Sequence, residues 1–568
     1  MKRLRWQLLI IFLTGLVVGI LLLGEQQPKQ IATEFTPTPV RGGAYTEAIV
    51  GQFQRLNPLL TFYNQADRDV SRLIFSGLVH YDGRGVAQAD LAESWGPSAD
   101  GTLYNVYLRK NATWHDGKPL TSDDVVFTID LMRDGGTIVP ADLQTFWKGI
   151  EVVRLNETTI QFRLPEAFAP FPDYLTFGIL PKHLLEGKKL ADIVNDSLNL
   201  MPVGSGPFKF NRLIVENDQI LGVALSAYDG YYLQKPYIQD IVLRYYPDQA
   251  AALKAFQSGE VQGIGNVGND ILQDVLAEKN LALYTARQPK MSLILFNLNN
   301  PEVTFFQDKL VRRALLTDLN RQRIIDRTLQ GQAVLANGPI FPGTWAYYSG
   351  IKTVEYDPAA AKGLMKQAGY TLAKDSDTIL TNKDKTLKFT LLYPDTDTHR
   401  AVAEAIQAAW ADLGADVALE PLPYDQLVSE RLVDRNFQAA LVDLDMARSP
   451  DPDPYPFWDQ AQSSGTGQNY SQWDNRMASE YLEQARISVD LNERAKMYRN
   501  FQVVFQEELP ALPLFYPVYT YAISKDIQDV RMGPLFDPSD RFNNVTEWHL
   551  AALPRVPSLT APTPTSKP

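Results

Sequence analysis

Hydrophobic and polar positions alternate most regularly between residues 103 and 109. One set of alternate positions is Tyr104, Val106 and Leu108, and the other is Leu103, Asn105, Tyr107 and Arg109. This period of two predicts a strand with one buried face. Turn residues flank it, with Ser98, Asp100 and Gly101 before it and His115, Asp116 and Gly117 after it. The segment therefore predicts a short strand between two tight turns.

Three further segments have helical patterns. The first begins at Thr121 or Ser122, either of which is a suitable N-cap, and it carries Asp123 and Asp124 in the first turn. The second runs from an N-cap at Asp357 to a stop at Gly369. Residues 400–413 form the third. The expected packing residues are Val125, Val126, Phe127 and Ile129 in the first, Ala359, Leu364 and Met365 in the second, and Ile406, Trp410 and Leu413 in the third.

Strand and helix patterns alternate without an internal repeat, which predicts a mixed α/β or α+β protein. At 568 residues the chain is too long for one core and should form two or three lobes. The net charge of −12 and the absence of basic runs beyond the N-terminus argue against a nucleic-acid partner. The absence of cysteine excludes disulfides, thiolate metal sites and a cysteine nucleophile.

The N-terminus has the pattern of an exported protein. Lys2, Arg3 and Arg5 precede an apolar run at 8–23, which fits a signal sequence or a short membrane span. Basic residues at this end predict a cytoplasmic N-terminus and an extracytoplasmic remainder. No clear cleavage site follows Gly24, so we favour an uncleaved anchor at 1–24 over a cleaved signal. Residues 25–39 should form a linker, and residues 559–568 a disordered tail.

Several blocks of the chain resemble the peptide and nickel class (family 5) of solute-binding proteins that supply ABC importers. The blocks are LAESWGPSADGTLYNVYLRKNATWHDGKPLTSDDVVFTID at 91–130, MPVGSGPFKF at 201–210, SLILFNLNNP at 292–301, VRRALLTDLNRQRIIDRTLQGQA at 311–333, the helix at 357–369, and ERAKMYRNFQVVFQEELPALPLF at 493–515. They follow one another in the order of that family over about 500 residues. A resemblance of this length is much more specific than any one short motif.

The resemblance implies an α/β fold with two lobes that close over a ligand, a type II-like periplasmic-binding-protein clamshell of the peptide-binding class with an extra domain inserted in lobe one. Crossover strands would join the lobes. The expected boundaries are 40–75, 199–288 and 517–549 for lobe one, 76–198 for the inserted domain, and 289–516 for lobe two.

Other chemistry has weaker support in the sequence. Gly263, Gly265 and Gly268 match GxGxxG. A dinucleotide site needs a strand before the glycines and a helix that begins at them. Here a helix pattern at 253–257 precedes the glycines and only a brief strand pattern at 261–264 overlaps them, so we reject this site. The five histidines are scattered, which argues against a transition-metal site, and His115 is assigned a structural role in its turn. No pattern of a nucleophile with its base appears. We therefore expect no cofactor and no enzymatic activity.

The segment DLDMARSPDPDPYPFW at 443–458 is the main candidate for ligand contact. A carboxylate there would pair with a ligand ammonium group in a charge-assisted hydrogen bond. The resemblance favours Asp445, because peptide-binding relatives use an aspartate shortly before a similar Asp-Pro-Asp sequence. The spacing here is longer than usual, so Asp443 and Asp451 stay open as alternatives. All of these acids also fit ordinary loop positions.

Aromatic and amide residues supply the remaining candidates for ligand contact. Tyr455 and Trp458 would line subsites, since aromatic faces bury much area and accept varied side chains. The other candidates are Asn297 at a strand end, Asn469 and Tyr470 after a glycine-rich turn, and Tyr63 in an early loop. Phe457 could also line a subsite, and core packing is the competing interpretation for it.

We therefore expect an extracytoplasmic, monomeric solute-binding protein that delivers a small peptide or similar solute to an ABC permease and its ATPase, held at the membrane by its N-terminal segment. Nickel and heme fit less well because of the histidine and cysteine counts, whereas an oligosaccharide stays open because aromatic clefts also suit sugars. A membrane-tethered sensor or scaffold with the same clamshell is the alternative, and an exported hydrolase is a remote third.

If Asp445 is the amino anchor, Asp445→Ala should weaken peptide binding by about 2 kcal/mol or more, because a charged hydrogen bond is lost. Calorimetry measures this directly. An unchanged affinity would remove Asp445 from that role.

Overall fold

One large mixed sheet organises the fold in the computed structural model, which describes residues 39–374, 377–383, 385–447 and 449–551. Within these residues, Arg41–Ala551 form one compact unit. The predicted anchor at 1–24, nearly all of the linker and the tail at 559–568 lie outside the described residues. Among the residues that are described, no helix is long and apolar enough to cross a membrane. The mixture of strands and helices confirms the predicted α/β class.

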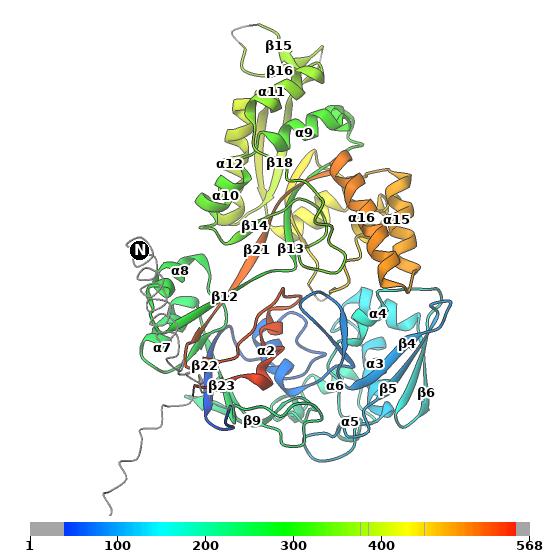
Figure 1. The fold of residues 1–568 in the computed structure, drawn as a ribbon, viewed down its shortest axis with the longest axis vertical. Helices are drawn as coiled ribbons and strands as arrows, with labels where there is room; N and C mark the ends of the chain where they lie inside the picture. The colour runs from blue at the N-terminus through cyan, green and yellow to red at the C-terminus, as the bar shows by residue number, and fades with distance from the viewer. Residues whose placement is uncertain (1–38, 375–376, 384, 448, 552–568) are drawn as a thin grey trace, which may run out of the picture. The chain divides into compact units, whose positions relative to one another are not determined.

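Twelve strands of the described chain form this sheet (Figure 1). Their order is β19 (Asp416–Leu422), β18 (Lys388–Pro394), β20 (Ala439–Asp445), β13 (Lys290–Phe296), β21 (Ala511–Ser524), β11 (Gly263–Ile264), β1 (Ala44–Val50), β10 (Asp240–Tyr246), β9 (Gln219–Ala227) and β8 (Phe208–Glu216), with β12 (Leu281–Arg287) and β14 (Ala333–Leu335) also paired to β21. The pairs β1–β10, β1–β11, β18–β19 and β18–β20 are parallel, and the others are antiparallel.

Helices and smaller sheets complete the described fold. The α-helices are α2 (Gln65–Ile74), α3 (Ser122–Arg133), α4 (Ala141–Lys148), α5 (Lys182–Leu185), α6 (Leu190–Ile193), α7 (Gln249–Gln257), α8 (Asn269–Ala277), α9 (Lys309–Thr317), α10 (Arg321–Thr328), α11 (Pro358–Gln367), α12 (Asp397–Leu413), α13 (Tyr424–Gln426), α14 (Tyr455–Trp458), α15 (Arg476–Ile487) and α16 (Leu491–Glu508). The 3-10 helices include η1 (Phe171–Leu175), η3 (Pro301–Gln307) and η6 (Pro538–Phe542). The smaller sheets are β2 (Val79–Tyr81) with β3 (Ala87–Ala89), β15 (Thr371–Leu372) with β16 (Leu380–Asn382) and β17 (Lys385–Thr386), β22 (Ile527–Gln528) with β23 (His549–Leu550), and β4 (Ala92–Pro97), β5 (Leu103–Leu108), β7 (Thr159–Arg163) and β6 (Glu151–Asn156).

Strand β21 belongs to both halves of the large sheet. Its first residues pair with β13 and β14, and the residues from Val518 onward pair with β12 and β11. The junction between β12 and β13 runs beside it, where the Gln288 backbone N–H donates to the carbonyl of Pro517 at 2.8 Å. Two chain segments thus cross side by side from one half to the other.

The hydrophobic core divides at the same crossing points. One cluster of buried residues extends from Met291 to Tyr516, and a second lies at 45–245 with Ala286 and residues 519–548. A smaller third cluster packs around α7 and α8. The first cluster lies within the proposed lobe two at 289–516, and the second spans residues proposed for both lobe one and the inserted domain. The limits of 40–75, 199–288 and 517–549 for lobe one stay predictions.

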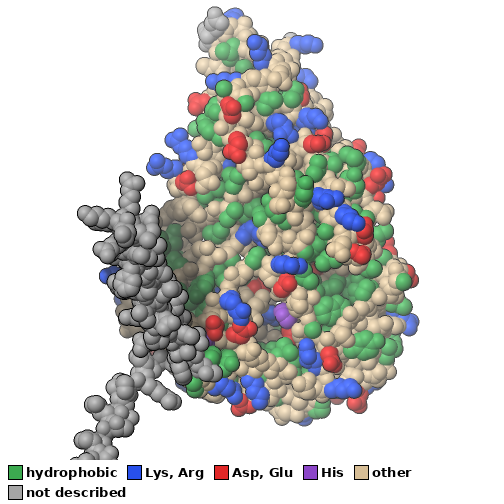
Figure 2. Space-filling view, viewed as in Figure 1, with side chains coloured by type: hydrophobic (Ala, Val, Ile, Leu, Met, Phe, Trp, Pro, Cys, Tyr) green, Lys and Arg blue, Asp and Glu red, His purple; other side chains and the backbone are tan. Residues whose placement is uncertain are grey.

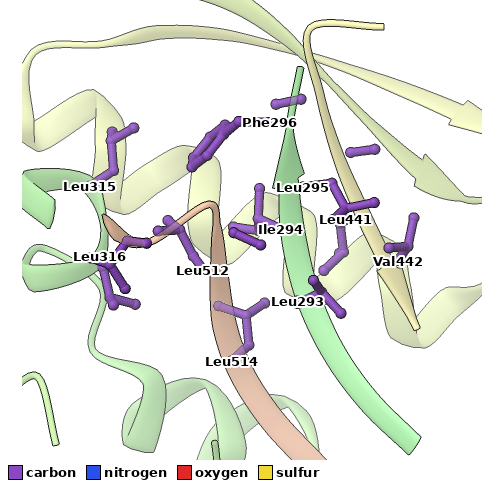
Figure 3. Packing of buried hydrophobic residues seen from close by; sticks show 14 of the residues in the cluster. Leu293, Ile294, Leu295, Phe296, Leu315, Leu316, Leu441, Val442, Leu512 and Leu514 are labelled. Atoms are coloured by element: carbon purple, nitrogen blue, oxygen red, sulfur yellow. The ribbon is translucent and has the colours of Figure 1, made fainter. Parts of the chain in front are cut away.

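Strand β13 is the centre of the lobe-two core. Six of its seven residues are buried, because β20 and β21 flank it and both of its faces are covered. Figure 3 shows Leu293, Ile294, Leu295 and Phe296 on β13, with Leu512 and Leu514 of β21 on one side and Leu441 and Val442 of β20 on the other. A continuous apolar strand is the expected consequence of this position.

The four-stranded sheet β4–β5–β7–β6 lies in the proposed inserted domain. On β5 the side chains of Tyr104, Val106 and Leu108 are buried and Tyr107 is 47% exposed, so the predicted one-faced strand is confirmed. The core of this sheet is continuous with that of lobe one. The inserted domain is therefore packed on lobe one and does not have a separate hydrophobic core.

All three predicted helices form. Thr121 and Asp124 make a capping box at the start of α3, and Asp357 caps α11. Ile406, Trp410 and Leu413 are buried on α12. The predicted packing of Ala359 is wrong. Ala359 is exposed, and α11 instead buries Ala361 and Met365, which lie four residues apart on the face that meets the core.

The glycines of the GxGxxG sequence are required by packing. A Cβ atom at Gly263 would collide with the hydroxyl of Tyr45, and one at Gly268 would lie 2.6 Å from the Gln249 side chain. Gly268 precedes α8, and its N–H donates to Gln249 Oε1 at 2.7 Å. Packing therefore explains why glycine occupies these positions, and no nucleotide is needed to account for them.

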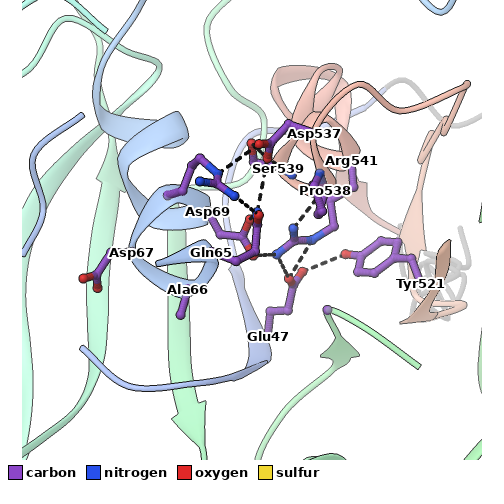
Figure 4. Close-up of polar contacts among 12 residues, drawn as sticks. Glu47, Gln65, Ala66, Asp67, Asp69, Tyr521, Asp537, Pro538, Ser539 and Arg541 are labelled. Atoms are coloured by element: carbon purple, nitrogen blue, oxygen red, sulfur yellow. Dashed lines mark hydrogen bonds and ion pairs between the residues drawn. The ribbon is translucent and has the colours of Figure 1, made fainter. Parts of the chain in front are cut away.

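A buried ion-pair network joins the first strand, the first helix and the C-terminal segment of lobe one (Figure 4). Arg541 lies 2.6 Å from Glu47 and 2.8 Å from Asp69, and all three side chains are almost completely buried. Tyr45 and Tyr521 donate hydrogen bonds to the other carboxylate oxygen of Glu47, at 2.7 and 2.8 Å. Every charge in the network has a partner, which a buried charge requires.

Arg541→Met should lower the free energy of unfolding by about 3–5 kcal/mol, because two buried carboxylates lose their cation. Urea unfolding followed by circular dichroism measures the change. Arg41→Met is the matched control, since its ion pair with Asp229 is largely exposed and should contribute less than about 1 kcal/mol. Equal losses in the two variants would contradict the role assigned to the network.

Candidate functional site

A cavity of about 340 Å³ lies where lobe one, the inserted domain and a segment of lobe two meet. The proposed lobe one contributes the 58–62 loop, α2 and residues of the 536–540 segment, and the proposed inserted domain contributes β2, residues of α4 and the 173–178 segment. Lobe two contributes Ala447, Ser449 and Pro450. Because all three parts line this cavity, a molecule held in it would contact lobe one, the inserted domain and lobe two at the same time.

Helix α2 forms one wall of the cavity. Asn64 caps its first turn, and its amphipathic pattern directs Val70 and Leu73 into the lobe-one core. The opposite side presents Arg68 and Arg72, one turn apart, to the cavity. Arg68 donates to the carbonyls of Thr61 and Phe62 at 3.0 and 2.8 Å and pairs with Asp537 at 2.9 Å, so it holds the neighbouring loops together.

The crossover strands position the contribution of lobe two. Strand β20 ends at Asp445, whose carboxylate accepts the N–H of Ala447 at 2.8 Å. The N–H of Met446 donates to the carbonyl of Pro289, at the junction of β12 and β13, also at 2.8 Å. The segment that reaches the cavity is therefore fastened directly to the point where the chain passes between lobes.

Aromatic rings and carboxylates dominate the remaining walls. The aromatic lining residues are Phe62, Phe75, Tyr81, Tyr174, Phe177 and Phe536, and the acidic ones are Asp142, Asp173, Asp537 and Asp540. Tyr174 is stacked on Phe146, with ring centroids 3.5 Å apart, which fixes its orientation. Burial raises the pKa of Tyr174 to about 12, with a further rise from nearby Asp173.

Asp173 joins the inserted domain to lobe two. Its carboxylate accepts a hydrogen bond from the Tyr81 hydroxyl and two longer ones, 3.3 and 3.2 Å, from the backbone N–H of Asp451. Burial, and then the charge of Asp451, raise the pKa of Asp173 well above its ordinary value. Asp451 in turn makes a bidentate ion pair with Arg494, with both distances 2.6 Å.

Metal binding finds no support in the described residues, where no group of three or more His, Asp or Glu side chains is arranged to hold an ion. His115 makes contacts that fit its predicted structural role. One ring nitrogen accepts the N–H of Gly204 at 3.2 Å, and the other lies 3.0 Å from the carbonyl of Gly206. Burial lowers the pKa of His115 to about 4, which keeps the imidazole neutral.

The two predicted acids of β20 lie at the strand end that precedes the cavity segment. Asp445 is exposed, and Lys290 lies 3.7 Å from it. Asp443 is mostly buried. Its carboxylate accepts a hydrogen bond from the Ser292 hydroxyl and lies 3.4 Å from His399 Nε2. Hydrogen bonding and charge from His399 lower the pKa of Asp443 despite its burial. Neither carboxylate is among the described residues that line the cavity.

The three candidates that follow in the chain contact other protein groups. Both oxygens of Asp451 bind Arg494, as described above. The Tyr455 ring lies under the Arg486 guanidinium at 4.3 Å, and Trp458 is buried against Phe505, with ring centroids 4.8 Å apart. Trp458 therefore belongs to the buried core of lobe two.

The remaining candidates are spread over the molecule. Asn297 donates to the carbonyls of Arg435 and Phe437, and Asn469 to those of Asp459 and Trp473, so both buried amides have structural partners. The Tyr470 ring faces Arg435 at 4.9 Å. Tyr63 is 84% exposed, beside the lining residue Phe62. The ligand contacts of all these residues stay predictions.

None of the predicted ligand-contact residues lines this cavity, and Arg72, Tyr81 and Asp173 are among the lining residues that were not anticipated from the sequence. The spacing of Arg68 and Arg72 indicates a common helix face, which is a usable but weak signal. Nothing local distinguishes Asp173 from other loop acids. Its importance follows from the approach of Asp451, which is 278 positions away in the chain.

Comparisons with known proteins agree on one family. The model described as "Bacterial extracellular solute-binding proteins, family 5 Middle" matches residues 87–468. The oligopeptide-binding protein AppA of Bacillus subtilis is 28% identical, with 93% of this chain and 95% of that protein covered. The dipeptide-binding protein of Escherichia coli is 26% identical, with 80% and 85% covered.

Solved structures extend the agreement to the fold. AppA of Bacillus subtilis in complex with a nonapeptide has a TM-score of 0.64 at 26% identity, and the match covers 91% of this chain and all of that one. The substrate-binding protein CtaP of Listeria monocytogenes has a TM-score of 0.73 at 25% identity, covering 90% and 99%. These matches confirm the predicted two-lobed fold with its inserted domain.

Asp451→Ala should lower the free energy of unfolding by about 3–5 kcal/mol, because it leaves Arg494 buried without its carboxylate. Urea unfolding measures this. Asp445→Ala is the matched control, since the Lys290–Asp445 pair is partly exposed and should contribute less than about 1 kcal/mol. If the Asp451→Ala variant kept its stability and lost only ligand affinity, the structural role would be contradicted and a ligand contact by Asp451 supported.

Proposed function

Because the chain belongs to the family 5 bacterial extracellular solute-binding proteins, we propose that it captures peptides or similar small solutes between its lobes and delivers them to an ABC permease with its ATPase. The cavity shared by lobe one, the inserted domain and the 447–450 segment of lobe two carries this proposal. The names of the relatives, which bind oligopeptides, dipeptides and a nonapeptide, support a peptide.

Capture would work through the crossover strands. The two crossings lie side by side at Gln288–Pro289 and Pro517, so small changes there can rotate one lobe against the other. A solute in the cavity contacts both lobes. It stabilises the closed arrangement because it binds that arrangement more tightly than the open one. No covalent step is needed, and we propose none.

The chemistry of the walls suits a peptide. Aromatic faces such as Tyr174 and Phe177 accept varied side chains, while Arg72 and the lining carboxylates supply charges of both signs for the chain ends. Positive and negative side chains are also interspersed over the face seen in Figure 2. An oligosaccharide is the second candidate, since aromatic walls also stack on sugar rings.

Delivery and location are further parts of the proposal. The protein would act outside the cytoplasm as a monomer, held at the membrane by an uncleaved segment at 1–24. A membrane-tethered sensor or scaffold without transport is the alternative. Loss of peptide uptake after deletion of the gene, restored by the intact gene, would favour import.

Native mass spectrometry of the purified protein should show added masses that match short peptides, and a synthetic tripeptide to pentapeptide library should supply binders. Ala447→Trp should reduce the fraction of protein that retains a bound peptide at least about tenfold, because the indole fills the cavity. Ala359→Trp, at an exposed site on α11, should leave it unchanged. Retention of sugars in place of peptides, or equal behaviour of the two variants, would contradict the proposed ligand or the proposed site.

A further inference from the structure

The proposed lobe two and the proposed inserted domain also touch outside the cavity, at a place that we call the rim contact. It joins Arg486, in the last turn of α15, and Val489, in the turn that follows, to Gly101 and to residues 167–169. The N–H of Ala169 donates to the carbonyl of Arg486 at 2.7 Å, and Val489 lies 3.2 Å from where a Cβ atom of Gly101 would be. Figure 1 shows the ends of α15 and α16, in orange, beside the blue and cyan elements of the inserted domain.

Arg486 is held in place by contacts within lobe two. Its Nε lies 2.9 Å from a carboxylate oxygen of Asp453, which is mostly buried, and its guanidinium lies over the Tyr455 ring, 4.3 Å from the centroid. Asp453 and Tyr455 follow closely on Pro450, which belongs to the lobe-two wall of the cavity. Arg486 therefore supports the segment that continues from that wall.

Phe168 is the partner of Arg486 on the inserted domain, with its ring centroid 5.1 Å from the guanidinium. The carbonyl of Phe168 accepts a hydrogen bond from the Tyr104 hydroxyl at 3.3 Å. Its ring packs against Phe146 and Tyr174, with centroids 5.9 and 6.0 Å away. Because Tyr174 lines the cavity, the rim contact connects the outer sides of two cavity walls, one from each part of the protein.

We propose that the rim contact is a latch that holds lobe two on the inserted domain and slows release of the solute, with Arg486 as its positioning residue. This inference rests on the proposed function and gives the inserted domain a part in it. The latch acts on the closed arrangement and not on the solute, because neither Arg486 nor Phe168 is among the described residues that line the cavity.

The location of the rim contact suits a latch. In the proposed closure the lobes rotate about the crossings at Gln288–Pro289 and Pro517. Figure 1 shows the crossing strands β12 and β21 left of the centre and the rim contact at the right. A rotation about the crossings would therefore separate Arg486 from Phe168 while the hydrogen bonds of β21 persist.

Both interactions of the rim contact are ones that opening would break. A guanidinium over an aromatic ring and a backbone hydrogen bond each stabilise the arrangement in which they form. The contacts of Arg486 with Asp453 and Tyr455 lie within lobe two and would remain in the open arrangement. The rim contact thus adds to the stability of the closed arrangement alone, which is the property of a latch.

Distances between the lobes, measured without any solute, test the latch directly. The chain has no cysteine, so Glu157→Cys on the inserted domain and Glu507→Cys on α16, both at exposed positions, can carry a pair of spin labels. In this labelled protein, Arg486→Ala should shift the distances measured by electron paramagnetic resonance to larger values, because the closed arrangement loses the rim contact. Arg476→Ala is the matched control, since Arg476 lies on the same helix and pairs with exposed glutamates of that helix.

Release of a peptide should respond in the same variants. The probe is the synthetic peptide that the wild-type protein retains best from the tripeptide to pentapeptide library, in a fluorescent form for stopped-flow measurements. Arg486→Ala should release it about fivefold to tenfold faster, with the association rate changed less than about twofold, because the contact forms only on closure. Phe168→Leu keeps an apolar side chain without the aromatic face and should give a smaller change in the same direction.

Circular dichroism checks that the variants fold, and Phe168→Leu keeps the inference testable if Arg486→Ala does not fold. Unchanged distances and release rates in the folded variants, or equal changes in Arg476→Ala, would overturn the latch and leave the proposed function intact. An association rate that falls as much as the release rate rises would indicate a damaged cavity and would also overturn it. Larger distances in a protein whose wild type retains no peptide would support the latch between the lobes and contradict the proposed function.

Discussion

Strand β21 is the constraint on which the two-lobed structure depends. It is hydrogen-bonded to β13 and β14 at one end and to β12 and β11 at the other, so both halves of the large sheet share one continuous strand. The hydrophobic cores stop on either side of its middle. Backbone hydrogen bonds therefore hold the lobes together where side-chain packing does not, and this combination permits a hinge.

The site depends on that crossing for its position. Met446 is bonded to Pro289 at the hinge, and the residues that follow it form the lobe-two wall of the cavity. On the other side, the buried network around Arg541 fixes the C-terminal segment that carries Asp537 against α2. One wall is thus attached to the crossover strands and the other to a buried ion-pair network of lobe one, which is the arrangement expected of a site that responds to lobe closure.

Local elements could be predicted because their causes lie within a few residues. The alternation at 103–108 and the N-caps at Thr121 and Asp357 act over one or two turns, and the structure shows each of them. Ala359 shows the limit, because its helix was predicted correctly but the direction of its buried face depends on the elements that pack against it. The site was less predictable, since an aspartate in a proline-rich loop has the same local pattern whether it binds a ligand or an internal arginine.

By itself, the sequence determined the strands, helices, caps and family of this protein, because hydrophobic periodicity and motif order are properties of neighbouring residues. Tertiary structure alone decided which carboxylates have cations. The Asp451–Arg494 pair joins residues 43 positions apart, and Asp173 meets Asp451 across 278 positions. Whether a buried charge is compensated depends on groups brought together by packing, and the local pattern around each acid carries no record of them.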